Sequence, residues 1–148
     1  MLYQDKYLNL NLKVSDYLGE AFNTGGKEDI TVLHCLLHNS GLAPDPDPWY
    51  WSQEFACPNS FHAYPEEDFS CMGSKIYASV FNEVVDYPPG EVYVYSDLNF
   101  MILSYIVGII AEENKLVTYD DYSDVCKSSP YLNDKGVSIM CSFESYVR

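Results

Sequence analysis

The segment Tyr95-Ser96-Asp97 lies between an alternating run at 91–95 and an apolar stretch at 98–112. A tyrosine held where two elements meet can present its hydroxyl to a cleft, and a phenol beside an ammonium group can act as a general base. A tyrosine at the end of a strand can equally serve in packing alone. Tyr95 is therefore a candidate for proton transfer, with packing as the alternative.

The usual serine nucleophile motifs are absent from the 148 residues. The sequence contains no Gly-x-Ser-x-Gly, no Ser-x-x-Lys, no Lys-Thr/Ser-Gly and no His-x-Gly. Ser74 and Lys75 are adjacent, so on a helix their side chains diverge by about 100° and the amine cannot take the hydroxyl proton. These residues therefore do not supply an activated serine by themselves.

Two histidines, His34 and His38, are spaced i and i+4, which can place two zinc ligands on one helix face. The segment lacks the glutamate of a His-Glu-x-x-His metalloprotease, and a third ligand would have to come from elsewhere. The alternative is that His38 bonds backbone near the helix end while His34 packs. A metal-dependent hydrolase would require stoichiometric zinc, and we expect no metal and no other cofactor.

Charge and hydropathy limit the partners. The net charge of −14 disfavours nucleic acid and anionic membrane surfaces, because both repel an acidic chain. The longest apolar stretch, 98–111, is shorter than the roughly 20 residues of a membrane-spanning helix. Residues 1–6 lack the basic start of a signal peptide, and no localisation is assigned from the sequence.

The five cysteines fall into two groups. Cys35 lies in an apolar helical pattern, where a buried free thiol is expected. The other four lie in loop-like surroundings. In an oxidising compartment, Cys57 could pair with Cys71 and Cys126 with Cys141.

Apolar spacing and capping residues predict helices at 31–39, 74–85 and 98–112. The last is apolar on nearly every side, which is typical of a buried helix. Residues 7–14 alternate between apolar and polar and are expected to be extended. Residues 43–70, rich in proline and aromatic residues, are expected to be irregular and to pack over a core or line a cleft.

The helix at 31–39 has recognisable ends. Thr31 is a suitable N-cap, and Gly41 stands where a left-handed residue ends a helix. Four apolar residues are expected to share one face: Ile30, Leu33, Leu36 and Leu37.

Three segments resemble the serine β-lactamase-related family, which includes class C β-lactamases, D-alanyl-D-alanine peptidases and related esterases. Residues 27–42 resemble its Ile-Thr-x-x-x-Leu-Leu-x-His-x-Ser-Gly-Leu signature, and residues 89–97 resemble its Pro-Gly-x-x-x-x-Tyr-Ser-Asn segment. Residues 10–18 are similar to the stretch that precedes the first signature. The resemblance covers about 6–112, interrupted by a cysteine- and aromatic-rich insertion at 43–72.

The resemblance implies an α+β fold of the β-lactamase/transpeptidase type, of which this chain would hold mostly the helical subdomain with long loops. Residues 1–148 would form one partial domain, with 118–148 unassigned. The implied chemistry is acyl-serine hydrolysis of ester or amide bonds in a small-molecule or peptide substrate. Tyr95 would be the proton-handling phenol, and Asp97 stands where the family usually has asparagine.

Two departures limit the implied activity. An ionised Asp97 can accept hydrogen bonds but cannot donate, so it can pair with a lysine ammonium but would repel a carboxylate substrate. The family's Ser and Lys precede the matched stretch, and its third motif lies beyond residue 148. We therefore expect a truncated serine hydrolase that is inactive as this chain. The alternative is a non-catalytic binding or interaction protein built on the same helical subdomain.

Overall fold

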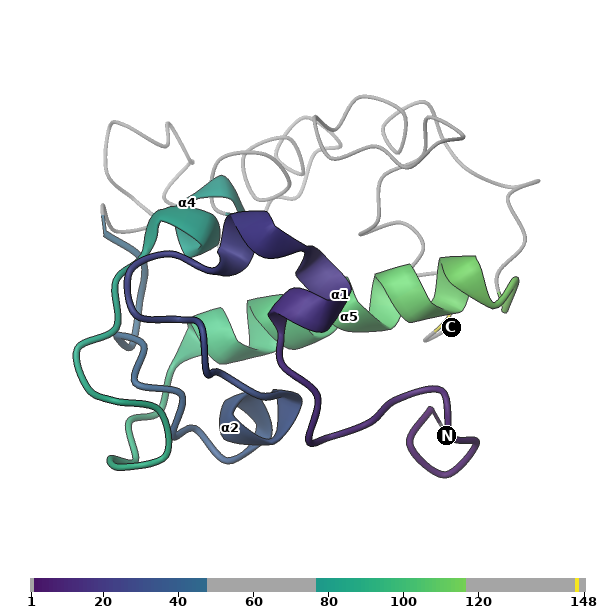
Figure 1. The fold of residues 1–148 in the computed structure, drawn as a ribbon, viewed down its shortest axis with the longest axis horizontal. Coiled ribbons are helices and arrows are strands. Elements are labelled where there is room, and N and C mark those ends of the chain that lie inside the picture. The colour runs from purple at the N-terminus through teal and green to yellow at the C-terminus, as the bar shows by residue number, and fades with distance from the viewer. Residues whose placement is uncertain (1, 48–76, 117–145, 147–148) are drawn as a thin grey trace, which may run out of the picture.

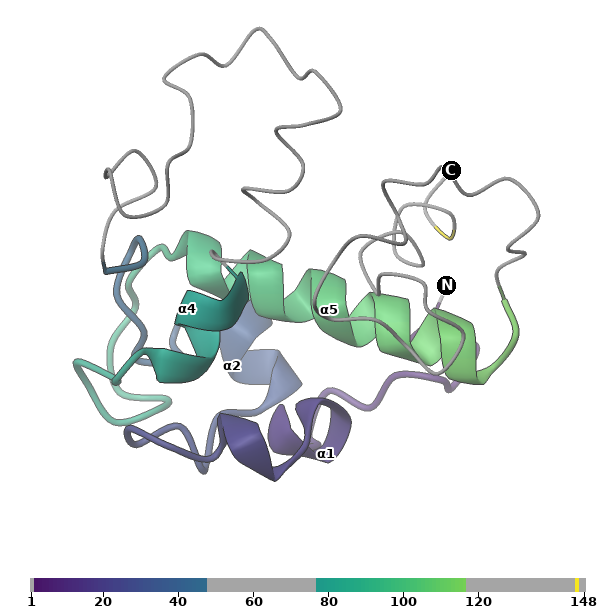
Figure 2. The same ribbon diagram turned by 90° about the horizontal axis from the view of Figure 1, so that it is seen from above.

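The computed structural model describes residues 2–47, 77–116 and 146. Its helices, in chain order, are α1 (Ser15–Leu18), the 3-10 helix η1 (Glu20–Phe22), α2 (Val32–Leu36), α4 (Tyr77–Asn82) and α5 (Asp97–Glu113). The long helix α5 runs through the middle of the molecule, and α1, α2 and α4 all contact it (Figures 1 and 2). This single helix therefore organises the described part of the fold.

Several sequence predictions fall outside the described residues. These are the pairings Cys57–Cys71 and Cys126–Cys141, most of the insertion at 43–72, and nearly all of 118–148.

Helix α5 confirms the helix predicted at 98–112 and extends it by one residue at each end. Ser96 is its N-cap, and along the helix only Asp97, Phe100 and Glu113 are exposed. The expectation of a buried helix is therefore also confirmed. In the part of the chain that the structure describes, no helix is long and apolar enough to cross a membrane.

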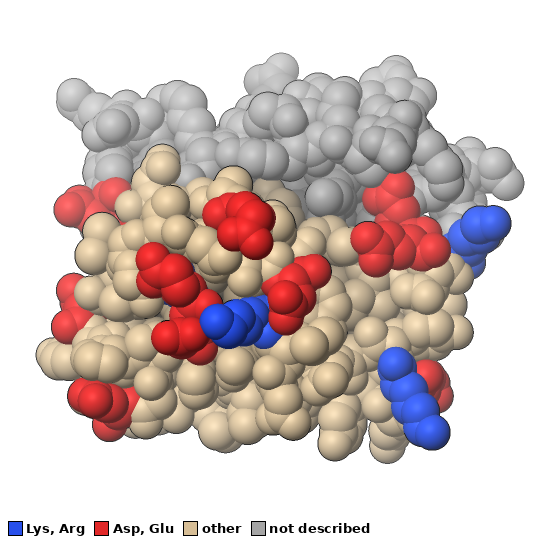
Figure 3. Space-filling view, in the orientation of Figure 1, with Lys and Arg blue, Asp and Glu red and all other residues tan. Residues whose placement is uncertain are grey.

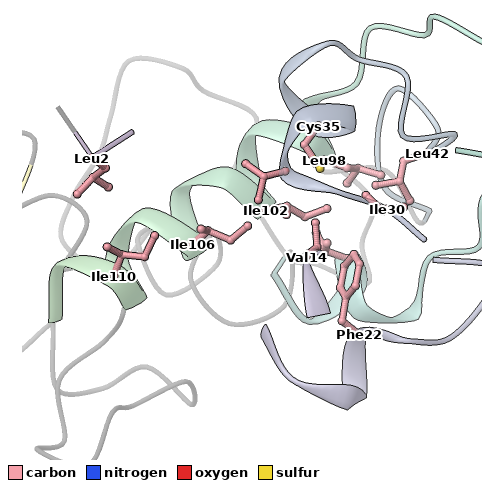
Figure 4. Close-up of a cluster of buried hydrophobic side chains, with 12 residues drawn as sticks. Leu2, Val14, Phe22, Ile30, Cys35, Leu42, Leu98, Ile102, Ile106 and Ile110 are labelled. Atoms are coloured by element: carbon pink, nitrogen blue, oxygen red, sulfur yellow. The ribbon is translucent and has the colours of Figure 1, made fainter. Parts of the chain in front are cut away.

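The core is a stripe along one side of α5 that is filled from the N-terminal segments (Figure 4). Four α5 residues, spaced four apart, are at most 2% exposed: Leu98, Ile102, Ile106 and Ile110. They pack in one cluster with buried residues from earlier in the chain: Leu2, Val14, Phe22, Ile30, Val32, Cys35 and Leu42. Burying each large aliphatic side chain contributes about 1.5–3 kcal/mol. Apolar burial thus fixes where α1 and α2 lie on α5.

The prediction that residues 7–14 are extended is confirmed only at the end of that run. Lys13 and Thr31 form an antiparallel bridge, the only isolated bridge among the described residues. On one side of it the Val14 amide donates to the Ile30 carbonyl, at 2.8 Å. These bonds hold the chain before α1 beside the start of α2.

Helix α2 ends earlier than the predicted 31–39. Thr31 is the N-cap as expected, and its Oγ1 accepts a hydrogen bond from the His34 amide at 3.2 Å. The last helical residue is Leu36, because His38 adopts a left-handed conformation (φ 54°). Gly41 is also left-handed, but it lies beyond the helix and serves a different turn.

The prediction that Ile30, Leu33, Leu36 and Leu37 share one face is wrong, because these residues differ in exposure. Leu36 is 42% exposed and Leu37 is 52% exposed, whereas Val32 and Cys35 are fully buried. The prediction extended the helical period past residue 36, where the helix has already ended. Ile30, which precedes the helix, is buried.

Helix α4 also ends before its predicted boundary. It covers Tyr77–Asn82, whereas the sequence predicted 74–85; residues 74–76 lie outside the described residues. The chain leaves the helix because its next amides bond elsewhere. Val85 donates to the Gly25 carbonyl at 2.9 Å, and Asp86 donates to the Gly41 carbonyl at 2.8 Å. These bonds bring the chain after α4 against two loops from the N-terminal half.

Candidate active site

A tight loop at residues 38–44, here the 38–44 loop, begins where α2 ends. The buried Ser40 hydroxyl accepts a hydrogen bond from the Leu42 amide at 3.3 Å. Gly41 has φ +86°, and a Cβ placed there would lie 1.9 Å from the Tyr87 carbonyl oxygen. Only glycine fits both the dihedral angle and this approach. The Ser-Gly-Leu end of the signature therefore has a local physical cause.

The 38–44 loop holds the segment that leads to the candidate tyrosine. The Gly90 amide donates to the Asn39 carbonyl at 2.7 Å, and the Val94 amide donates to the His38 carbonyl at 2.8 Å. Residues 91–95 alternate between exposed and half-buried, as the sequence predicted, although they form no strand. Backbone hydrogen bonds to a loop thus take the place of sheet pairing here.

Three more hydrogen bonds fix the turn into α5. The Ser96 amide donates to Nδ1 of His38 at 3.1 Å, and its hydroxyl donates to the Ala43 carbonyl at 2.6 Å. The Asp97 amide donates to the Pro44 carbonyl at 2.9 Å. We call the 38–44 loop and the 90–97 segment together the junction. Its hydrogen bonds, made by Val94, Ser96 and Asp97, set the position of the segment Tyr95-Ser96-Asp97.

The imidazole ring of His38 lies at the centre of the junction and is 9% exposed. Its centroid is 4.5 Å from that of Tyr95, 5.3 Å from that of Phe100 and 6.1 Å from that of Tyr93. The fully buried Asn99 brings its Nδ2 to 3.3 Å from His38 Nδ1. His38 therefore contacts a backbone amide, the side-chain amide of Asn99 and three aromatic rings.

Both sequence-predicted site residues lie at this point. Tyr95 is 61% exposed, and the centroid of its ring is 4.5 Å from that of His38. Asp97 is exposed in the first turn of α5, where the helix dipole favours a carboxylate. The structure thus brings the tyrosine and the signature histidine together, a pairing that the sequence reasoning did not predict.

The two histidines do not share a helix face. His34 is in α2, and its Nδ1 accepts a hydrogen bond from the Thr31 amide at 3.2 Å. His38 is beyond the helix, and its Nδ1 accepts from Ser96. The interpretation that His38 bonds backbone is therefore confirmed, with a partner distant in sequence. Among the described residues, no three His, Cys, Asp or Glu side chains are grouped to hold a metal ion.

Lys27 is a buried cation that the sequence reasoning did not single out. It is 1% exposed, and its ammonium donates to the carbonyls of Phe81 (3.1 Å) and Glu83. It also lies 5.5 Å from the centroid of the Phe22 ring. Burial lowers the pKa of Lys27, and burial raises the pKa of Glu83. The lysine therefore caps the end of α4 and holds it against the 24–27 turn.

The local sequence does contain a signal for this contact. Gly25 and Gly26 are both left-handed, with φ of 65° and 84°, and form the turn at 24–27. A Cβ at Gly26 would lie 2.6 Å from a methyl carbon of Val85. Glycines let another segment of the chain approach closely, so the ammonium of a lysine beside them can reach the carbonyl oxygens of that segment.

Cys35 is a free, fully buried thiol, as the sequence predicted. Burial raises the pKa of the Cys35 thiol to about 12. A thiol that stays protonated is a poor nucleophile. Cys35 therefore serves in packing, not in chemistry.

Acidic side chains are spread over the face seen in Figure 3, with few basic ones among them. One ion pair on the surface joins Lys13 and Asp29 at 2.8 Å. The hydrogen bond with Asp29 raises the pKa of Lys13 and lowers that of Asp29. Both side chains are exposed, so the pair contributes little to stability.

Comparison with known proteins assigns the family. The model of the Beta-lactamase family matches residues 1–122 of the 148. No curated protein and no solved structure matched the chain. The family match covers most of the chain and includes the entire junction. On this evidence the protein belongs to the Beta-lactamase family.

Proposed function

We propose that this chain carries the tyrosine-bearing part of an acyl-serine hydrolase site that acts on ester or amide bonds. Membership of the Beta-lactamase family supports a protein related to serine hydrolases, with small-molecule substrates. The observation that carries the proposal is the junction, which fixes the backbone on both sides of an exposed Tyr95. The described helices would belong to the helical subdomain of an α+β fold.

In this proposal the Tyr95 phenol moves the proton. A phenol beside the ammonium of a Ser-x-x-Lys lysine can exchange a proton with the attacking serine or the leaving group. Tyr95 as a whole is 61% exposed, while its ring contacts that of His38. A fixed ring with an accessible hydroxyl is the arrangement that general acid–base catalysis requires.

Asp97 gives the proposed site a preference for uncharged ligands. Its carboxylate lies two residues from Tyr95 and can accept from an ammonium, but it repels a ligand carboxylate. Phenylacetylglycine carries that carboxylate, and phenylacetylglycinamide replaces it with an uncharged amide of nearly the same size. Asp97→Asn should strengthen binding of the acid by about threefold to tenfold, because one like-charge contact near the surface is removed.

Binding of the amide serves as the control for this substitution and should change little. Isothermal titration of both ligands against both proteins measures the difference. An equal change for acid and amide would contradict the placement of Asp97 beside the ligand.

We further propose that the 148 residues do not carry out covalent turnover by themselves, because they contain no Ser-x-x-Lys. The purified chain should leave nitrocefin and p-nitrophenyl acetate at their background rates of hydrolysis. A fluorophosphonate probe should label no serine. Turnover that Tyr95→Phe abolishes would show that a nucleophile within this chain is active, and would contradict this part of the proposal.

The second candidate function is a non-catalytic binding or interaction protein built on the same helices. The exposed aromatic rings of Tyr93, Tyr95 and Phe100 favour it, because clustered exposed aromatic groups are typical of contact surfaces. Saturable binding of a partner protein by a stable monomer, unchanged by Asp97→Asn, would favour this function over the hydrolase-related one.

A further inference from the structure

At the junction, His38 contacts both the candidate phenol and the backbone turn that follows it. Its Nδ1 is 3.1 Å from the Ser96 amide nitrogen, and its ring is 4.5 Å from that of Tyr95, tilted by 35°. We propose that neutral His38 is the positioning residue for Tyr95: its ring fixes the phenol, and its Nδ1 fixes the start of α5.

The hydrogen bond determines the form of the imidazole. Nδ1 accepts from a backbone N–H, so the ring proton must be on Nε2. Adding a second proton would place an N–H of His38 against the N–H of Ser96. The contact at 3.3 Å with Nδ2 of Asn99 would become donor against donor as well. The positioning contacts thus exist only for the neutral ring.

The conformation of His38 also matters for this role. Its φ of 54° is uncommon for a side chain of this size, and it directs the chain out of α2 into the 38–44 loop. The His38 carbonyl accepts from Val94 in the same loop. The backbone and the side chain of His38 therefore bind the 90–97 segment at Val94 and at Ser96, on both sides of Tyr95.

This inference rests on the proposed function, since a positioning residue matters only if Tyr95 moves the proton. Two variants of the full 148-residue chain separate the two contacts. His38→Asn retains an acceptor near Nδ1 and tolerates positive φ, but removes the ring. His38→Phe retains a ring and removes the acceptor.

Two NMR measurements follow the two contacts. The χ1 scalar couplings of Tyr95, assigned by the signal that Tyr95→Phe removes, should report one rotamer in the wild type and in His38→Phe, and averaging in His38→Asn. Hydrogen exchange of the Ser96 amide should be slow in the wild type and in His38→Asn, and about tenfold faster in His38→Phe. Tyr3, which is also 61% exposed, is the control tyrosine and should not change.

Acid titration of the wild type repeats the second test without a substitution, in case His38→Phe does not fold. Protonation of His38 should lower the protection factor of the Ser96 amide, which is its exchange rate corrected for the intrinsic rate at each pH, while the Val94 amide, bound to the His38 carbonyl, keeps its protection factor. The titratable groups whose rings contact that of His38 are the phenols of Tyr93 and Tyr95, and the carboxylate that follows Ser96 in the sequence is that of Asp97.

A purely structural role for His38 would move both measurements together in both variants, and that result would overturn the proposal. So would a single Tyr95 rotamer in His38→Asn, or an Ser96 amide that stays protected through protonation of His38. None of these measurements depends on ligand binding. Failure of the proposed function would instead appear as ligand binding that Tyr95→Phe leaves unchanged.

Discussion

The apolar core and the junction hold the same helix, α5, by different forces. Along its buried side, Ile102 and Ile106 are held by close packing with residues from α1, α2 and their flanking loops. At its N-terminal end, Ser96 and Asp97 are held by hydrogen bonds to the 38–44 loop. Apolar burial has no preferred direction, whereas a hydrogen bond weakens steeply when its angle or length changes.

The difference assigns separate tasks to the two regions. The core can place α5 to within the tolerance of side-chain packing, and it supplies most of the stability. The junction adds the directional precision that a proton-transferring phenol requires. Substitutions in the two regions should therefore affect stability and site geometry in different proportions.

The largest effect is expected from Gly41→Ala in the junction. Alanine at this position must adopt φ +86° and bring its Cβ to 1.9 Å from the Tyr87 carbonyl oxygen, so the loop must move. We expect a loss of about 4 kcal/mol in the free energy of unfolding. Urea denaturation measures it.

Gly19→Ala is the matched control. Gly19 has φ +82°, but no atom lies within 4 Å of the Cβ it would carry. This control should cost only about 1 kcal/mol, the penalty of the dihedral angle alone. Equal losses at the two positions would show that the close approach at Gly41 does not constrain the junction.

Ile102→Ala in the core should cost about 3 kcal/mol, because it removes buried methyl groups and leaves a cavity. The comparison becomes sharper if site geometry is measured as well. At temperatures where the variant is folded, the Ser96 amide should remain protected from exchange and Tyr95 should keep one rotamer. Loss of either signal would mean that the core also sets the geometry of the junction.

Lys27→Met should cost about 2 kcal/mol at neutral pH, since the Phe81 and Glu83 carbonyls lose a charged donor. Burial lowers the pKa of Lys27 below its ordinary 10.5, so just below that pH the unfolded chain binds more protons than the folded one. The stability of the wild type relative to Lys27→Met should therefore rise as the pH approaches 10.5. Urea denaturation of both proteins at a series of pH values measures this difference. A difference in the free energy of unfolding that fell as the pH rose would contradict this account.

The sequence predicted best what depends on local pattern. Helix α5 was expected within one residue at each end because the stretch after Ser96 is predominantly apolar as far as Ala111 and polar residues follow it. The Thr31 N-cap was predicted because capping is a contact between residues three apart. The chemistry of Tyr95 was predicted from its position between two elements and from the resemblance to the family, that of Asp97 only from the resemblance, and both remain predictions.

What the sequence could not predict depends on contacts between distant segments. The early end of α2 follows from His38, whose left-handed backbone is stabilised by bonds to residues 94–96, more than 50 positions away in the chain. The burial of Lys27 likewise depends on carbonyls beyond position 80. Neither contact leaves a periodic pattern, so propensity and spacing predicted a longer helix and made no prediction of the environment of Lys27.

The most direct test of the central claim is the affinity of the chain for phenylacetylglycinamide, measured for the wild type, Tyr95→Phe and Tyr3→Phe. The two tyrosines are equally exposed, at 61%, but only Tyr95 lies at the junction. The account predicts that Tyr95→Phe weakens binding by about tenfold, the loss of one hydrogen bond, while Tyr3→Phe has no effect. Equal affinities for all three proteins would contradict it.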